Sequence, residues 1–445
     1  MRAHESRCHF RKITKIGDTK LQMEQTNRTA VETKIEQAEN KLREKGVFDR
    51  IDRIAFENQK KVMAAFRKHK VSESYFMPSS GYGYNDRGRE ELEAIYADVF
   101  ECEAALVRHN IVSGTQTLAI GLFGLLRPGD TLFSVTGKPY DTLEEVIGIR
   151  GDAGNGSLAD FGVKYAAQEM TADGEIDLEK MCAFLKSEPS VKVVFIQRSK
   201  GYAIRKTLSA EEIGQAVKAA KAVKPEAFVI VDNCYGEFCD EHEPTYYGAD
   251  LCMGSLIKNP GGGMAETGGY LAGSAKAVEL CAYRLTCPGI GAEGGATLGQ
   301  TKSMYKGLFY APHTVAQSLK TAALAAAVFE NEGFAVCPAS DEVRHCIIQT
   351  VSLGSEKNML AFCRGIQEGA PVDSHVTPEP WQMPGYAVPV IMAAGAFTQG
   401  SSIELSADGP CIAPYTVYMQ GGLTYESGKI GVMFALEHML EAKDV

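Results

Sequence analysis

The sequence predicts an α/β fold in which a mostly parallel sheet, with helices on both faces, forms a large domain and a smaller α+β domain follows. Two observations support this prediction. From about residue 90 onward, strand-like apolar runs alternate with helix-like segments, which is the rhythm of parallel sheets. The chain of 445 residues is also longer than one ordinary hydrophobic core can serve.

Composition and charge narrow the class of protein. Hydrophobic residues make up 45% of the chain and charged residues 23%, as in soluble globular proteins. The net charge of −10 argues against nucleic acid or an anionic membrane as the main partner. No apolar run reaches the roughly 20 residues of a membrane helix, and the polar N-terminus lacks the apolar core of a signal peptide. We therefore expect a cytoplasmic protein.

Three regions are expected along the chain. Residues 1–70 form an N-terminal helical segment, residues 71–320 the large domain and residues 321–445 the small domain. Residues 1 to about 28 are polar and lack periodicity, so poor order is expected there. From residue 30 to residue 68 apolar residues recur at helical spacing, which predicts two or three helices.

The elements of the large domain follow from apolar runs bounded by turn and capping residues. Helices are expected at residues 89–100, 113–126, 141–149, 178–185 and 209–223, and strands at 104–107, 131–135, 191–197, 228–232 and in a run that ends near Ser255. Residues 268–272 are expected to return as a hairpin-like strand. A long helix at residues 302–330, kinked by Pro312, leads out of this domain.

Lys258 is the most informative residue for function. It follows a strand-like run and precedes a glycine run, whereas Asp232 closes the strand before it in the chain. This order suggests a pyridoxal phosphate site, where a lysine forms a Schiff base with the cofactor aldehyde and an aspartate pairs with the pyridinium nitrogen. The alternatives are a solvated loop lysine and a capping or ion-paired aspartate.

Further polar signals follow other strands, at the edge where open α/β sheets bind ligands. The segment Ser113-Gly114-Thr115 opens a helix whose first amides favour a phosphate, although Ser113 is also an ordinary N-cap. Tyr140 is expected either to stack on a flat cofactor ring or to pack in the core. Ser255, three residues before Lys258, could reach the same phosphate.

Several motifs together resemble one family. They are Gly81-Tyr82-Gly83-Tyr84-Asn85-Asp86-Arg87-Gly88-Arg89, Val112-Ser113-Gly114-Thr115, Gly137-Lys138-Pro139-Tyr140-Asp141-Thr142, Gln197-Arg198-Ser199-Lys200-Gly201-Tyr202, Asp232-Asn233-Cys234-Tyr235-Gly236-Glu237-Phe238 and Lys258-Asn259-Pro260-Gly261-Gly262-Gly263. From about residue 30 to the C-terminus, the chain resembles the methionine γ-lyase-like or aluminium-resistance proteins. These belong to the fold-type I pyridoxal phosphate enzymes, related to cystathionine β- and γ-lyases. The resemblance implies a seven-stranded, mostly parallel sheet.

The resemblance also implies roles for individual residues. Lys258 would hold the cofactor as an internal aldimine and move the α-proton, Asp232 would keep the ring nitrogen protonated, and Tyr140 would stack on the ring. The phosphate would be bound by Ser113, Gly114, Thr115 and Ser255. In relatives the segment around Tyr82 and Tyr84 reaches the cofactor of the neighbouring subunit, and Arg89 would add charge there. A homodimer or homotetramer with shared active sites is implied.

One segment departs from the family pattern. Residues 406–415 resemble a family segment that carries an arginine where Ile412 stands. An arginine would suit the substrate carboxylate, so without it another cation is expected to bind the carboxylate. Arg198, Lys200 and Arg205 are the other candidates, and solvated loop cations are their alternative.

The function that the resemblance implies is β- or γ-elimination from a sulfur amino acid by a carbon–sulfur lyase. Another reaction of the same cofactor, such as aldol cleavage or transamination, and a non-catalytic regulatory protein of this fold remain alternatives. We expect no metal site, because Cys234, Cys239 and His242 match no standard zinc spacing. Cys234 is expected to be a packed thiol, with a catalytic thiol as its alternative.

Overall fold

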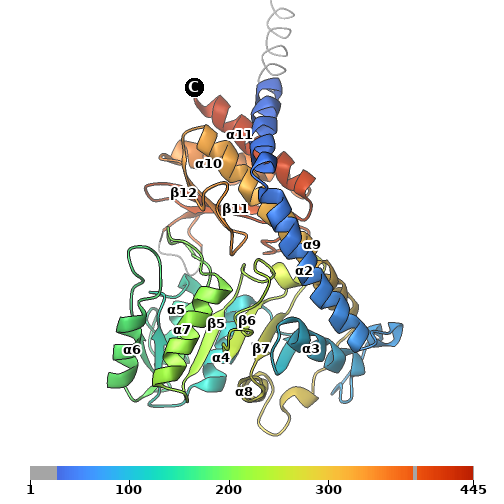
Figure 1. The fold of residues 1–445 in the computed structure, drawn as a ribbon, viewed down its shortest axis with the longest axis vertical. Helices are drawn as coiled ribbons and strands as arrows, with labels where there is room; N and C mark the ends of the chain where they lie inside the picture. Colours follow the sequence, from blue (N-terminus) through green and yellow to red (C-terminus); the bar gives the residue numbers. More distant parts are fainter. Residues whose placement is uncertain (1–27, 384–387, 444–445) are drawn as a thin grey trace, which may run out of the picture.

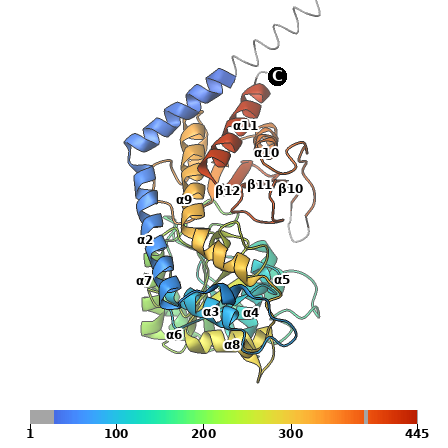
Figure 2. The same ribbon diagram turned by 90° about the vertical axis from the view of Figure 1, so that its right-hand side faces the viewer.

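The computed structural model describes residues 28–383 and 388–443. It shows a large lobe and a small lobe connected by long helices (Figures 1 and 2). A helix over residues 28–44 opens the described chain, and α2 (Val47–Lys68) continues along the molecule. These helices agree with the expected N-terminal helical segment, whereas the poor order expected for residues 1 to about 28 falls, apart from residue 28, outside the described residues.

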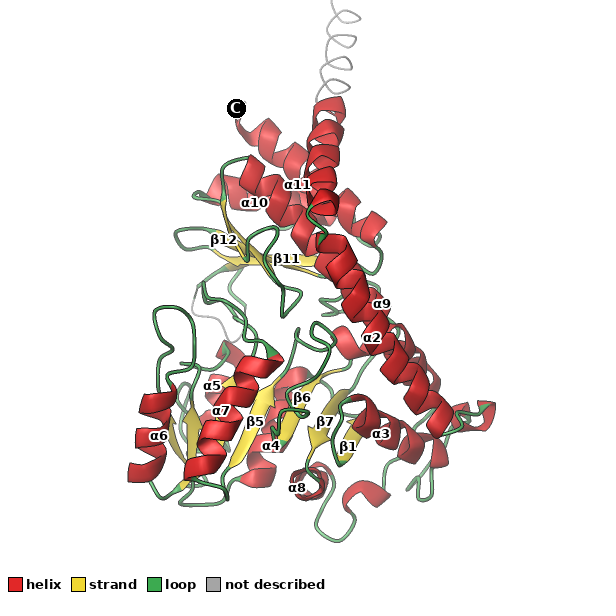
Figure 3. Ribbon diagram, viewed as in Figure 1, coloured by secondary structure: helices red, strands yellow, loops and turns green. Residues whose placement is uncertain are grey.

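The large lobe contains β1 to β7 and the small lobe β8 to β12 (Figure 3). The strands of the large lobe are β1 (Ala104–Arg108), β2 (Thr131–Ser134), β3 (Lys164–Ala167), β4 (Val191–Gln197), β5 (Phe228–Asp232), β6 (Leu251–Ser255) and β7 (Gly269–Gly273). Its helices are α3 (Arg87–Val99), α4 (Gly114–Leu125), α5 (Asp141–Ile147), α6 (Leu178–Ser187), α7 (Ala210–Val223) and α8 (Ala275–Leu285), with short 3₁₀ turns η1 (Glu73–Phe76), η2 (Asn259–Gly261) and η3 (Gly291–Glu293).

The large sheet confirms the predicted α/β class. Its seven strands lie in the order β1-β7-β6-β5-β4-β2-β3, and only β7 runs against the others. Side chains alternate between the two faces of each strand. In β4, Val193 and Phe195 pack with α4, α5 and α8, whereas Val194 and Ile196 pack with α6 and α7. Helices therefore cover both faces of the sheet.

Most predicted elements are present, with one strand missed. The edge strand β3 pairs only with β2, and its side chains are exposed or half-buried. Such a short edge strand lacks the apolar run by which the other strands were recognised. The expected return at residues 268–272 is β7, which pairs antiparallel with both β6 and β1.

The long helix α9 (Thr301–Asn331) belongs to both lobes. It continues through the buried Pro312 and changes direction along its length (Figure 2), as expected where a proline removes a helical hydrogen bond. It contacts α2, η2 beside Lys258, and the small-lobe helix α11. Because α9 runs across residues 320 and 321, the division into three regions stays a prediction.

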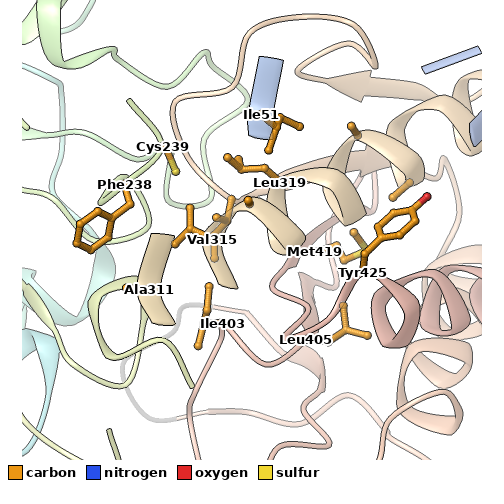
Figure 4. Packing of buried hydrophobic residues seen from close by; sticks show 14 of the residues in the cluster. Ile51, Phe238, Cys239, Ala311, Val315, Leu319, Ile403, Leu405, Met419 and Tyr425 are labelled. Atoms are coloured by element: carbon orange, nitrogen blue, oxygen red, sulfur yellow. The ribbon is translucent and has the colours of Figure 1, made fainter. Parts of the chain in front are cut away.

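The small lobe is an antiparallel sheet with helices packed on it. It contains β8 (Ala335–Cys337), β9 (Gln349–Ser352), α10 (Glu356–Glu368), β10 (Val390–Ala393), β11 (Ser406–Pro410), β12 (Thr416–Gln420) and α11 (Tyr425–Lys443). The strand order is β10-β11-β12-β9-β8. Figure 4 shows one apolar cluster that extends along α9 from Phe238 in the large lobe to Tyr425 in the small lobe. In the described part of the chain, no helix has the length and apolar character needed to cross a membrane.

Candidate active site

Five predicted residues line one cavity at the edge of the large sheet. Strands β2, β4, β5 and β6 are parallel, so their carboxyl ends meet at this edge. The cavity of about 130 Å³ is lined by Gly114, Thr115, Leu118, Tyr140, Thr142, Leu143, Gln197, Ser199, Gly201, Asp232, Cys234, Tyr235 and Lys258. We call it the lysine cavity.

Lys258 presents its amine inside this cavity. The side chain leaves the turn after β6, and Nζ lies 4.0 Å from the centre of the Tyr235 ring. Burial alone would lower the pKa of Lys258, but its neighbours, among them the carboxylate of Asp232, raise it above its usual value. Without a ligand the amine is therefore an ammonium ion facing an aromatic ring and a carboxylate.

Asp232 is the buried carboxylate of the site. It ends β5, and Oδ1 accepts a hydrogen bond from the Cys234 amide at 3.2 Å. Burial raises the pKa of Asp232, and the charge of Lys258 opposes that rise. A buried carboxylate of this kind needs a positive or hydrogen-bonding partner.

Gly114 lines the cavity and lies close to Ser255, whereas Ser113 and Ser255 themselves are not among the residues that line it. Ser113 caps α4, because its Oγ accepts from the Gln116 amide at 3.1 Å. A Cβ placed on Gly114 would lie 3.5 Å from the Ser255 Cβ and 3.7 Å from the Cys234 Sγ. The start of α4 and the end of β6 thus form one small cradle. Burial raises the pKa of Cys234, so this thiol is packed there in its neutral form.

Tyr140 stands at the entrance of the cavity. It precedes α5, and its amide donates to Gln197 Oε1 at 2.7 Å. Its ring centre lies 6.0 Å from that of Tyr202. Tyr140 also lines a second cavity toward the small lobe, so it stands between the two.

The predicted substrate cations do not line the lysine cavity. Arg198 is buried, and its guanidinium is bound by Asp240 at 2.6 Å and Glu243 at 3.3 Å. Lys200 Nζ donates to the Cys337 carbonyl at 3.0 Å. Buried cations require such partners. Neither side chain lines the lysine cavity, and a role of Arg198 and Lys200 in binding the substrate stays a prediction.

Arg205 binds backbone carbonyl groups of a loop. Its Nη2 donates to the carbonyls of Gln197 and Ser199, at 3.0 and 2.6 Å. It therefore holds the loop that follows β4, and it does not line the lysine cavity. Ile412 is exposed on the turn between β11 and β12, and it also stands outside that cavity.

The tyrosine segment lies on the surface, away from the cavity of its own chain. Tyr82 and Tyr84 are 79% and 50% exposed, and their rings stack with centres 5.6 Å apart. Arg89 is buried and donates to the carbonyls of Gly83 and Gly295 at 2.7 and 2.6 Å. Arg89 thus supports this loop from within, and its contribution of charge at a neighbouring subunit's cofactor stays a prediction.

Sequence reasoning missed a second cavity, which adjoins the lysine cavity. It is lined by Tyr140, Tyr202, Tyr235, Met392, Ala394, Ala396, Gly400, Ser401, Ser402, Ser406, Asp408 and Gln420, and we call it the small-lobe cavity. The two cavities share Tyr140 and Tyr235. One feature of the sequence could have indicated this cavity. The strand β11 contains the polar residues Ser406 and Asp408, and both are buried.

Known proteins resemble this chain over nearly its whole length. The family model for methionine gamma-lyase matches residues 31–440. The crystal structure of a carbon-sulfur lyase involved in aluminum resistance from Clostridium novyi NT is 48% identical, covers 94% of this chain and 98% of its own, and has a TM-score of 0.89. The Bacillus subtilis protein YnbB is 50% identical over 424 residues, which are 95% of this chain and 99% of YnbB.

A more distant structure supports the fold alone. The pyridoxal-5′-phosphate-dependent protein YhfS from Escherichia coli is 16% identical and covers 88% of this chain and 96% of its own, with a TM-score of 0.58. The matching family model spans both lobes, and it agrees with the resemblance found in the motifs. The chain belongs to the methionine γ-lyase family.

Proposed function

We propose that this protein is a pyridoxal phosphate-dependent carbon–sulfur lyase, which releases a thiol from a sulfur amino acid by β- or γ-elimination. One observation carries the proposal: the lysine cavity brings together the amine of Lys258, the carboxylate of Asp232 and the start of α4 at Gly114. The name of the Clostridium novyi relative, a carbon-sulfur lyase, is consistent with this activity.

The residues of the lysine cavity fit the cofactor. Asp232 offers a buried carboxylate for a pyridinium N–H, and its Oδ1 accepts from the Cys234 amide. A Cβ on Gly114 would already touch Ser255 and Cys234, so the glycine keeps this cradle open, and the cradle adjoins the first amides of a 12-residue helix, which suit a phosphate. Tyr140 would lie over the ring, and Ser255 and Thr115 would complete the phosphate site.

Pyridoxal phosphate, when bound, supplies an electron sink that stabilises negative charge at the α-carbon of an amino acid. Side chains of the protein transfer the protons and position the reacting groups. Lys258 takes the proton from the α-carbon and holds it for transfer, as a general base. Asp232 keeps a proton on the ring nitrogen through its negative charge. Tyr140 and Tyr235 enclose the reacting atoms between aromatic rings.

The overall reaction balances without an oxidant. In β-elimination, an S-substituted cysteine and one water give a thiol, pyruvate and ammonium. In γ-elimination, methionine and one water give methanethiol, 2-oxobutanoate and ammonium. The C–S bond breaks with its electron pair on sulfur, and the sulfur receives a proton.

A second copy of the chain would complete the site. Tyr82 and Tyr84 are too exposed to serve a cavity of their own chain, and Arg89 holds their loop in a fixed position. In the proposed homodimer or homotetramer, these tyrosines would reach the cofactor of the neighbouring subunit.

The test is an assay of the purified protein with pyridoxal phosphate and, separately, cystathionine, methionine and cysteine. A released thiol, together with pyruvate or 2-oxobutanoate, would support the proposal, and the keto acid distinguishes β- from γ-elimination. Absence of both products with every sulfur amino acid would refute it.

A further inference from the structure

Asp408 lies in the small-lobe cavity, next to the lysine cavity. Its side chain is 8% exposed. The Tyr202 hydroxyl donates to Oδ2, and Gln420 Nε2 donates to Oδ1 at 3.1 Å. A carboxylate offers about four lone-pair positions, so this pair of donors leaves room for a ligand.

A second polar group points to the same ligand site. The Ser402 hydroxyl lines the small-lobe cavity and is buried, yet it has no hydrogen-bond partner among the described residues. A buried hydroxyl without a hydrogen-bond partner destabilises the folded protein unless a ligand forms a hydrogen bond with it. Ser402 and Asp408 therefore offer a neutral and a charged acceptor to one occupant of the cavity.

The charged groups that line this cavity indicate which kind of ligand group can bind in it. Among the described residues, its lining includes no lysine, arginine or histidine, and Asp408 is its one charged group. Burial raises the pKa of Asp408, and the Tyr202 and Gln420 donors and the nearby Lys258 partly oppose that rise. An anionic group would be repelled here, and an apolar group would leave both acceptors unsatisfied.

We propose that Asp408, assisted by Ser402, binds an ammonium group on the side chain of the substrate. This inference rests on the proposed function, and it specifies the substrate class. The reacting carbon lies near Lys258, and the side chain passes Tyr140 and Tyr235 into the small-lobe cavity. The preferred substrate is a sulfur amino acid whose departing thiol carries an amino group. Asp408 is thus a specificity residue.

The test compares two probes of nearly equal shape. S-(2-aminoethyl)-L-cysteine ends in an ammonium, whereas S-propyl-L-cysteine ends in a methyl. Binding is measured by calorimetry on the Lys258→Ala protein loaded with pyridoxal phosphate, which should bind without turnover. The same pair is compared by kcat/KM with Lys258 intact. We expect the aminoethyl compound to be favoured by roughly ten- to a hundred-fold, as for a hydrogen bond to a charged group.

Asp408→Asn should bring that ratio close to one in both measurements. Glu379→Gln removes an exposed carboxylate from the same lobe and should leave the ratio unchanged. Equal affinity for both probes in the Lys258→Ala protein, where Asp408 is intact, would overturn the inference. Tighter binding of the anionic S-(2-carboxyethyl)-L-cysteine would also overturn the inference. An unchanged ratio between the aminoethyl and propyl compounds in a folded Asp408→Asn protein would overturn it as well.

Failure of the proposed function is distinguishable from failure of this inference. If no sulfur amino acid yields a thiol and a keto acid, the lyase proposal fails, yet the ratio of dissociation constants still decides whether Asp408 binds an ammonium. If products form but the two probes bind equally well, the lyase proposal is supported and Asp408 does not recognise an ammonium group.

Discussion

Lys258 and Asp232 are the residues on which the proposed chemistry depends. Asp232 ends the buried strand β5, Lys258 follows the buried strand β6, and both line the lysine cavity. Chain order and strand ends were enough to predict this pair, because parallel strands bring their carboxyl ends to one edge. Asp408 and Ser402 could not be predicted in the same way, since the small lobe contributes them to a cavity that meets the lysine cavity only at Tyr140 and Tyr235.

Lys258→Ala should remove the long-wavelength absorbance of the lysine-bound cofactor. It should also lower the rate of elimination by roughly 10²- to 10⁴-fold, the usual contribution of a general base. Absorbance spectra and a thiol assay measure these effects, and circular dichroism checks that the fold is kept. An unchanged spectrum in the folded variant would contradict the role of Lys258.

Glu237 is a buried carboxyl that lies behind the site. Its Oε1 accepts from the Tyr270 hydroxyl at 2.8 Å, and Oε2 has no partner among the described residues. Burial raises the pKa of Glu237 from 4.5 to about 8. The side chain is therefore protonated in the folded protein at neutral pH, while in the unfolded chain it is ionised.

This difference predicts how stability depends on pH. Between about pH 4.5 and about pH 8, the folded state retains a proton that the unfolded state has lost. The free energy of unfolding should therefore fall as pH rises, with Glu237 contributing about 1.4 kcal/mol per pH unit. Glu237→Gln should weaken this dependence.

Denaturant unfolding at pH 5.5 and pH 7.5 measures the effect. The difference between the two free energies should be smaller in Glu237→Gln than in the parent protein. Glu379→Gln, which alters an exposed carboxylate, is the control and should behave like the parent. Equal pH dependence in all three proteins would count against a protonated Glu237.

At the scale of elements, α9 fixes the turn that carries Lys258. A Cβ on Gly307 would lie 2.5 Å from the carbonyl oxygen of Gly261, and a Cβ on Gly262 would lie 2.5 Å from the Gly307 oxygen. Backbone therefore packs on backbone, three residues after Lys258. The sequence showed a run of glycines here, but it could not show which helix approaches them.

Gly307→Ala should destabilise the protein by about 1–3 kcal/mol, because the added methyl overpacks this contact. It should also weaken cofactor binding, since the turn after Lys258 must shift. Denaturant unfolding and a titration with pyridoxal phosphate measure the two effects. Lys306→Ala, at an exposed neighbouring position, should change stability by less than about 0.5 kcal/mol. A fully stable Gly307→Ala protein would be inconsistent with the close approach.

The prediction of elements succeeded where the signal was local. Strands β4 and β5 are buried apolar runs, and Ser209 and Asp177 mark helix starts by capping. The edge strand β3 has no such run. The ion pairs of Arg198 could not be predicted for a different reason: its acidic partners, Asp240 and Glu243, come from a turn whose path the sequence did not reveal.

At the scale of the whole molecule, the proposed assembly predicts complementation between defective chains. A Tyr84→Ala subunit would lack the aromatic that its neighbour needs, whereas a Lys258→Ala subunit would lack its own amine. Mixed and reassociated, the two variants would form some sites with both residues intact. Partial recovery of thiol release, above that of either variant alone, is expected.

The control mixes Lys258→Ala with Asp232→Ala, which are defects of the same cavity. That mixture should recover no activity, because each site would lack one of the two groups. Light scattering establishes whether the chains associate. A strictly monomeric protein that retains full activity would contradict shared sites.

The length of α9 has a consequence for how this chain could change in evolution or design. An α-helix turns by about 100° and advances about 1.5 Å for every residue. One residue inserted near the middle of α9 would rotate and displace the small lobe, with Asp408, relative to Lys258. Insertions in surface turns such as residues 151–156 are tolerated in comparison. The 31 residues of α9 thus act as a spacer of fixed length, which sets how far apart the reacting carbon and the recognised end of a substrate can be.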